Sequence, residues 1–162
     1  MVSDYEIDVD NQIVLSYRPD DRWSGRILIH ASYESYSGTS EAWIDLEKVV
    51  AFAKSLTQYP IENDSPIKVA SGYGTPTDLD QELVALEVGP VGIKGQIGVK
   101  IPLWPDDRRE SLKEVRFEFL TTYQRLSTFS NDILCVLQGQ MVEAVLGSEI
   151  LRQRLVGPTC TF

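Results

Sequence analysis

The spacing of apolar residues changes most clearly between Glu114 and Leu137. Up to Phe119 apolar side chains occupy every second position, which is the spacing of a strand with one buried face. From Leu126 onward they recur at intervals of three and four residues, which is the spacing of one helix face. The segment therefore predicts a strand over 113–121 that leads directly into a helix.

The same alternation predicts further strands. They cover residues 5–11, 12–18, 25–35, 67–72, 82–89 and 95–104, and a turn at Ser37-Gly38 precedes a short strand or the approach to a helix. Asp10-Asn11 is placed to turn a hairpin between the first two strands. The glycine-rich loop before residue 95 favours another hairpin, and the spacing onward to 113–121 favours an antiparallel meander. Residues 73–81 lack any period and predict an irregular connection.

Two helices are predicted. The first covers 44–60, where Asp45 is positioned to accept hydrogen bonds from the first turn and Pro60 ends the helix. The second begins with Thr121 and Gln124, which fit a capping box, and its apolar stripe continues past a weak point at Gly139 to a C-terminal cap at Gly147. Residues 148–156 are compatible with one further short helix.

This order of elements is not the strict alternation of a parallel α/β sheet. It predicts the α+β class, with a single antiparallel sheet of about six strands and two helices packed on one face. We expect residues 1–162 to form a single domain. Within it, 1–24 would be an N-terminal hairpin, 25–146 the core of sheet and helices, and 147–162 a C-terminal tail.

Composition supports a globular chain. Of 162 residues, 43% are hydrophobic and 24% charged. The apolar runs are far shorter than the ~20 residues that cross a bilayer, and the N-terminus lacks the pattern of a signal peptide. These features predict a cytoplasmic protein without a membrane partner.

The net charge of −9 argues against nucleic acid as a partner, and the acidic excess lies mainly in the first 65 residues. Glu6, Asp8 and Asp10 share one face of a predicted strand at intervals of roughly 7 Å. Asp20 and Asp21 follow in a loop. Two interpretations stay open: a solvated strand face that discourages aggregation, or an acidic patch that meets a basic partner.

The sequence contains no motif of a catalytic or metal site. His30 is the single histidine, so an ordinary zinc site is excluded, and we interpret it as structural or solvent-facing. The chain lacks the GxSxG, P-loop and GxGxxG motifs, and residues 8–11 begin like a calcium loop that is not completed. We therefore predict no enzyme, no metal and no cofactor.

The remaining residues of chemical interest have structural interpretations. Cys135 falls within the helical pattern and predicts a small buried side chain, whereas Cys160 receives no role. Two cysteines are too few for a disulfide framework. Trp23, Trp43 and Trp104 stand beside loops or helix starts, where exposure of one of them stays open, and the favoured prediction is core or rim packing.

The order of the segments GRILIHASYE, DLEKVVAFAKSL, ELVALEVG, GQIGVKIPL, EVRFEFLT and YQRLSTFSNDILCVL resembles the WapI-type immunity proteins of bacterial polymorphic-toxin systems. The resemblance covers Gly25 to Leu137. It also includes the linker with Gly38, Trp43 and Ile44, the Gly95 strand start, the Phe117-x-Phe119 pair and the Leu126 stripe, which together are moderately specific. It implies neutralisation of a toxin, such as a nuclease, by one-to-one binding in the cytoplasm of the producing cell.

Three hypotheses follow. The first is a non-enzymatic inhibitor of a protein toxin that binds through Glu6, Asp8, Asp10, Asp20 and Asp21. The second is a small-ligand or protein-interaction module without a toxin partner, whose signature would be an exposed apolar pocket lined by Trp or Tyr. The third, an enzyme, would require two carboxylates close together in a deep cleft with raised pKa values.

Overall fold

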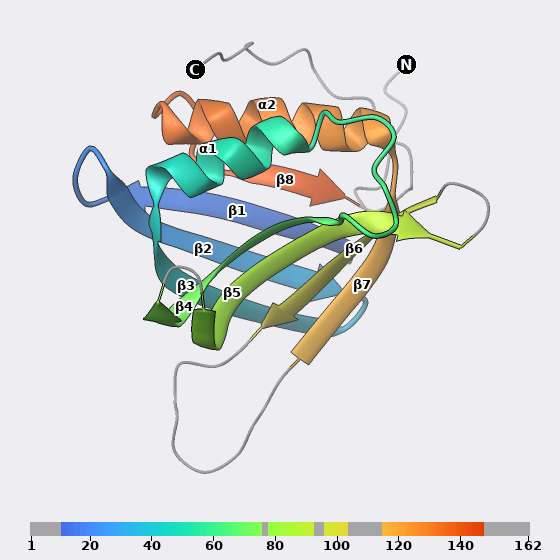
Figure 1. Ribbon diagram of the computed structural model, residues 1–162, viewed down its shortest axis with the longest axis horizontal. Helices are drawn as coiled ribbons and strands as arrows, with labels where there is room; N and C mark the ends of the chain where they lie inside the picture. Colours follow the sequence, from blue (N-terminus) through green and yellow to red (C-terminus); the bar gives the residue numbers. More distant parts are fainter. Residues whose placement is uncertain (1–10, 76–77, 93–95, 104–114, 148–162) are drawn as a thin grey trace, which may run out of the picture.

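The computed structural model describes residues 11–75, 78–92, 96–103 and 115–147, and the structural statements below refer to these. The elements are shown in Figure 1. In chain order they are β1 (Asn11–Pro19), β2 (Ser24–Tyr33), β3 (Tyr36–Asp45), α1 (Leu46–Ser55), β4 (Ile67–Thr75), β5 (Asp78–Val91), β6 (Gln96–Leu103), β7 (Val115–Thr121), α2 (Tyr123–Leu137) and β8 (Ala144–Gly147).

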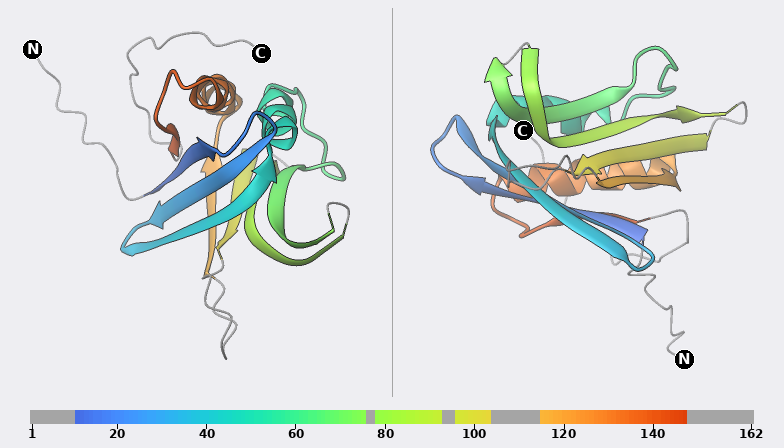
Figure 2. Two further views of the ribbon diagram at one scale, coloured as in Figure 1. Left: turned by 90° about the vertical axis from the view of Figure 1, so that its left-hand side faces the viewer. Right: turned by 90° about the horizontal axis from the view of Figure 1, so that it is seen from below.

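The strands form two four-stranded antiparallel sheets. Their orders are β3-β2-β1-β8 and β4-β5-β6-β7 (Figures 1 and 2). The predicted α+β class, with two helices and antiparallel pairing, is confirmed in this part of the chain. The predicted single sheet of about six strands is wrong, because α1 carries the chain away from β3 and a second sheet begins at β4.

Both sheets contribute to one hydrophobic core. In the first sheet, Ile13 and Leu15 of β1 stand opposite Ala31 and Ile29 of β2, and all four side chains are fully buried. The same core includes residues from β5, β6, both helices and β8. Alternation in the sequence thus identifies the inward faces of these strands correctly.

The two sheets meet along β3. The Ser40 hydroxyl donates to the carbonyl of Leu83 on β5, and the Ser71 hydroxyl of β4 donates to the carbonyl of Trp43. The helices lie side by side over the sheets, α1 next to β3 and β4, α2 next to β1 and β8 (Figure 1).

Helix α1 begins differently from the prediction. Asp45 occupies the N-cap position, but its side chain makes no capping hydrogen bond. The amide of Leu46 instead donates to the carbonyl of Trp23 at 2.8 Å, so the start of the helix is held by the loop between β1 and β2. The helix ends at Ser55, before the predicted end at Pro60.

The predicted change from strand to helix is confirmed at Thr122. Strand β7 ends at Thr121 and α2 begins at Tyr123. The Thr122 hydroxyl accepts a hydrogen bond from the amide of Arg125 at 3.2 Å, which satisfies one of the free donors of the first turn. The capping residue is therefore one position later than the predicted Thr121, which is buried.

Helix α2 ends at Leu137, and the predicted continuation to Gly147 is wrong. The amide of Gly139 donates to the carbonyl of Val136 at 3.0 Å, and that of Gln140 to the carbonyl of Cys135 at 2.9 Å. With Gly139 at φ 74°, this is the Schellman arrangement that ends helices. The chain then returns as β8, which pairs with β1.

Two connections also differ from the predictions. The β2–β3 hairpin turns at Glu34, which has φ 52°, and not at Ser37-Gly38. Within 73–81, β4 and β5 continue as a hairpin with register shifts after Ser71 and Tyr73, where an irregular connection was predicted.

The predicted hairpin between β5 and β6 and the meander onward to β7 are confirmed. Residues 5–10 of the predicted strand 5–11, and the predicted helix 148–156, lie outside the described residues, while Asn11 begins β1.

Cys135 is fully buried in α2, as predicted. It is also disulfide-bonded, which the sequence analysis did not expect. Cys160, the other cysteine of the sequence, lies outside the described residues.

Candidate protein-binding surface

The loop between β1 and β2 is organised by Asp21. Its carboxylate accepts hydrogen bonds from the amides of Trp23 at 2.7 Å and Ser24 at 2.8 Å. These backbone donors hold the pKa of Asp21 below its usual range, because they stabilise the charged form. The carboxylate thus fixes the shape of the loop.

Close packing holds the base of this loop. A Cβ atom at Gly25 would lie 2.4 Å from the carbonyl oxygen of Arg18 and 2.7 Å from the ring of Tyr17, so only glycine fits. The Tyr17 hydroxyl is buried and has no hydrogen-bond partner among the described residues. Burial raises the pKa of Tyr17, and the negative charges of Asp21 and Asp45 raise it further.

The shaped loop presents Trp23 to solvent. The side chain of Trp23 is 68% exposed, and the Arg22 guanidinium carbon lies 4.7 Å from its ring centroid. This is the geometry of a cation–π contact, which limits the mobility of both side chains.

A second such pair lies on the neighbouring strands. Trp43 of β3 is 51% exposed, and Arg26, its partner across the ladder to β2, lies 5.3 Å from its ring centroid. The Arg26 Nη1 atom also lies 3.1 Å from Glu41 Oε1, so the guanidinium is held from two sides. We call Arg22, Trp23, Arg26, Glu41 and Trp43 the Trp–Arg surface.

A shallow cavity of about 280 Å³ adjoins the Trp–Arg surface. It is lined by Ser16, Arg18, Leu28 and Val142 together with Arg26 and Glu41. Arg18 and Arg26 stand directly opposite each other on β1 and β2. Like charges at directly opposite positions destabilise a strand pair. The stability of the β1–β2 ladder therefore does not account for the presence of these two arginines.

The predicted site residues lie in two groups. Glu6, Asp8 and Asp10 lie outside the described residues. Asp20 and Asp21 are brought together with the Trp–Arg surface by the β1–β2 loop, Asp20 exposed and Asp21 engaged with the loop backbone. Of these two, Asp20 is the better candidate for a contact with a partner.

The sequence leaves open the exposure of one tryptophan, whereas the structure exposes two. The prediction of core or rim packing is wrong for Trp23 and Trp43, while Trp104 lies outside the described residues. The signal for Trp43 was present in the alternation of β3, in which Ala42 and Ile44 point inward and position 43 therefore points outward. It was missed because the strand was not predicted over its full length.

His30 lies on the outer face of the first sheet, where its Nδ1 atom is 2.6 Å from the Thr39 hydroxyl. Among the described residues, no group of three His, Cys, Asp or Glu side chains is arranged to hold a metal ion. Within the same residues, no helix is long and apolar enough to cross a bilayer.

Comparison of the chain with protein-family models, with curated proteins and with solved structures finds no match.

Proposed function

We propose that this chain is a non-enzymatic immunity-type protein that binds a toxin one to one and neutralises it in the cytoplasm of the producing cell. The Trp–Arg surface, with Asp20 beside it, is the proposed contact. The observation that carries the proposal is the pair of exposed tryptophans, each stacked with an arginine, at one end of the β2–β3 ladder.

Tryptophan and arginine are the residue types that most often dominate the energy of protein–protein contacts. Exposing two tryptophan rings to water is unfavourable. A partner that covers them removes this apolar surface from water, which contributes a favourable free energy of binding. The cation–π contacts restrict both side chains before binding, so less conformational entropy is lost on association. These features favour a docking surface over an ordinary solvated sheet end.

The toxin part of the proposal rests on other support. The order of elements from Gly25 to Leu137 resembles WapI-type immunity proteins, and the net charge of −9 suits a basic partner such as a nuclease. An acidic inhibitor is steered toward the phosphate-binding surface of such an enzyme and occupies it.

The test is co-expression of the chain with the toxin encoded beside it. We expect cells to survive and an affinity tag on the chain to recover the toxin in a one-to-one complex. Survival of the cells without any complex in the pull-down would contradict direct inhibition.

The contact surface is tested with the variants Trp23→Ala and Trp43→Ala. Each should weaken binding by about 2 kcal/mol, or roughly 30-fold in Kd, if the tryptophan is a hot spot. Tyr36→Ala is a matched control, because Tyr36 is 69% exposed at the opposite end of the same strand as Trp43. Parent affinity in both tryptophan variants would exclude this surface as the contact.

A further inference from the structure

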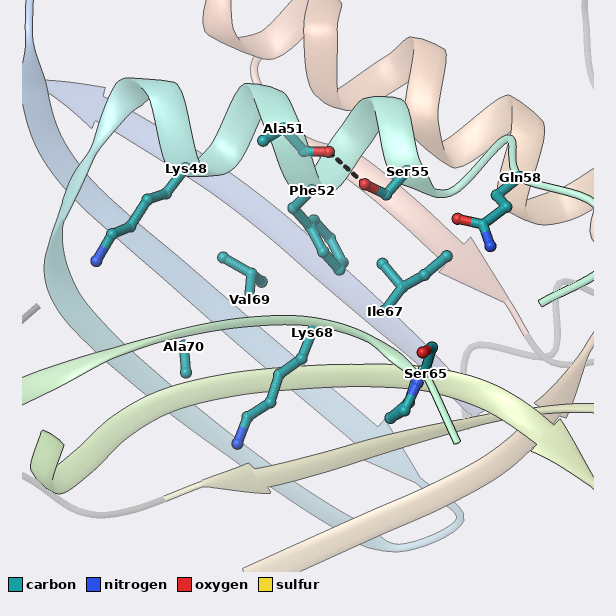
Figure 3. Close-up of a pocket in the computed structure, with 11 residues that line it drawn as sticks. Lys48, Ala51, Phe52, Ser55, Gln58, Ser65, Ile67, Lys68, Val69 and Ala70 are labelled. Atoms are coloured by element: carbon teal, nitrogen blue, oxygen red, sulfur yellow. Dashed lines mark hydrogen bonds between the residues drawn. The ribbon is translucent and has the colours of Figure 1, made fainter. Parts of the chain in front are cut away.

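A second surface lies on the other sheet, between α1 and β4. A groove of about 510 Å³ runs between the two elements (Figure 3). On its helix side it is lined at intervals of three and four residues, from Lys48 to Gln58, which is one face of α1 and the turn that follows it. On its strand side the lining is the continuous run 65–70. The groove therefore follows the direction of a strand.

The groove borders a strand edge that is open. β4 is an edge strand, which pairs with β5 on one side only. Apart from the ladder to β5, no backbone hydrogen bond joins residues 66–70 to another element in the described part of the chain. In an antiparallel pair, every second residue turns its amide and carbonyl away from the partner strand. The backbone groups that β4 turns away from β5 therefore lie at the open edge of the sheet, which borders the groove.

The groove has an apolar floor, and the side chains on its two walls are small. Phe52, Ile67 and Val69 are nearly fully buried and form the floor. Ala51 and Ala70 stand on opposite walls, where larger side chains would fill the space. The run 65–70 extends about 17 Å at 3.3 Å per residue, which matches five or six residues of an extended peptide.

One end of the groove is positively charged. The ammonium groups of Lys48 and Lys68 both lie toward the same end (Figure 3). Lys68 pairs with Glu82 at 2.7 Å, while no ion pair of Lys48 is recorded among the described residues. In a chain of net charge −9, two lysines at the end of a groove favour a ligand that carries a negative charge there.

We propose that an extended segment of a partner protein adds to the free edge of β4 as a fifth strand of this sheet, with a carboxylate of that segment bound by Lys48 and Lys68. Strand addition supplies backbone hydrogen bonds along the edge, and the apolar floor accepts every second side chain. This proposal goes beyond the toxin contact. It concerns a different sheet and requires neither the Trp–Arg surface nor a toxin.

A second copy of this chain is a poorer occupant. Antiparallel pairing of two β4 edges centred on Lys68, the middle of the run 66–70, would place the two Lys68 side chains opposite each other. Like charges at opposed positions destabilise a strand pair. A negatively charged peptide meets no such repulsion.

The test is an NMR titration of the full chain with synthetic peptides, followed at the backbone amides of Ile67 to Ala70. The probe is an N-acetylated hexapeptide in which threonine and valine alternate and the last residue is aspartate. A second peptide ends in lysine, and a third carries proline at its two central positions, which removes backbone donors. We expect the aspartate peptide to shift the β4 amides and to bind at least tenfold more tightly than either of the others.

Variants on α1 test the charged end. Lys48→Glu should weaken binding of the aspartate peptide about tenfold and strengthen binding of the lysine peptide. Lys54→Glu is the matched control, since it makes the same charge change on the same helix outside the groove lining, and should leave both affinities unchanged. Lys48 lies in the first turn of α1, where an acidic side chain is favoured, so unfolding would not explain a loss of binding.

Several results would overturn the proposal. One is the absence of shifts at the β4 amides at millimolar aspartate peptide, and another is equal binding of the proline peptide. Decanoate that shifts these amides more strongly than the peptide would show a site for an amphipathic anion. A concentration-dependent dimer in sedimentation, with the same amides shifted, would assign the edge to a second copy. None of these results bears on the tryptophan variants, so the two proposals fail separately.

Discussion

The end of α2 can be tested with one substitution, Gly139→Ala. Gly139 has φ 74°, in the left-handed region, and it forms the Schellman arrangement that ends the helix. The apolar pattern of the sequence instead predicts that the helix continues through this position to Gly147. The two alternatives assign opposite signs to the effect of the substitution on stability.

The magnitude follows from backbone geometry alone. No heavy atom lies within 4 Å of a Cβ atom built on Gly139, so alanine meets no steric clash there. Holding alanine in the left-handed region costs about 1–2 kcal/mol, and its smaller unfolded-state entropy returns part of this. We expect the free energy of unfolding to fall by about 1 kcal/mol. In a continuous helix alanine would raise it by about 1 kcal/mol.

Urea unfolding of the parent and the variant, followed by circular dichroism, measures this difference. Gly139→Asn is the control, because asparagine adopts the left-handed region more readily than other residues that carry a Cβ atom. It should lose less stability than Gly139→Ala. A Gly139→Ala protein more stable than the parent would refute the ending of α2 at Leu137.

Three further predictions concern two tyrosine hydroxyls and the charge of the β1–β2 loop. Tyr17→Phe should leave the free energy of unfolding unchanged or raise it by up to about 1 kcal/mol, because the hydroxyl has no partner among the described residues. Tyr123→Phe should lower it by about 1 kcal/mol or more, because the buried amide of Ile61 donates to that hydroxyl at 3.1 Å. The lowered pKa of Asp21 means that its carboxylate stabilises the fold above its unfolded pKa, about 3.9. Asp21→Ala should therefore lower the free energy of unfolding, measured with urea, most at neutral pH. The difference from the parent should shrink as the pH falls below about 4. An undiminished difference at pH ~3 would contradict the role of the charge.

The spacing of apolar side chains predicts secondary structure correctly where that structure depends on the segment alone. The strand-to-helix change at Thr122 and the inward faces of β1, β2 and β7 are visible in the sequence because side-chain spacing reports burial directly. The division into two sheets is not local. It depends on β1 pairing with β8, more than 100 residues later in the chain, and on the hydroxyl of Ser40 meeting β5.

The candidate site was predictable only in part. The β1–β2 loop was recognised from its acidic residues, but the sequence does not show that Asp21 is engaged by its own loop backbone. Arg26 is recognised as the partner of Trp43 only once the register of β2 and β3 is known, since the two residues are 17 positions apart in the chain. A contact between side chains on neighbouring strands can be predicted only when the register of the two strands is known.

The distribution of charge assigns different roles to the acidic residues and the tryptophans. The net charge is −9, yet both proposed docking features among the described residues include arginine or lysine. In the proposed complex the acidic excess, which lies mainly in the first 65 residues, would act at long range, where it would speed the approach of a basic partner and weaken with added salt. The tryptophans would act only after contact, because burial of their rings requires the partner to be in place. The proposal therefore implies that charge governs the rate of association and that the Trp–Arg surface governs the lifetime of the complex.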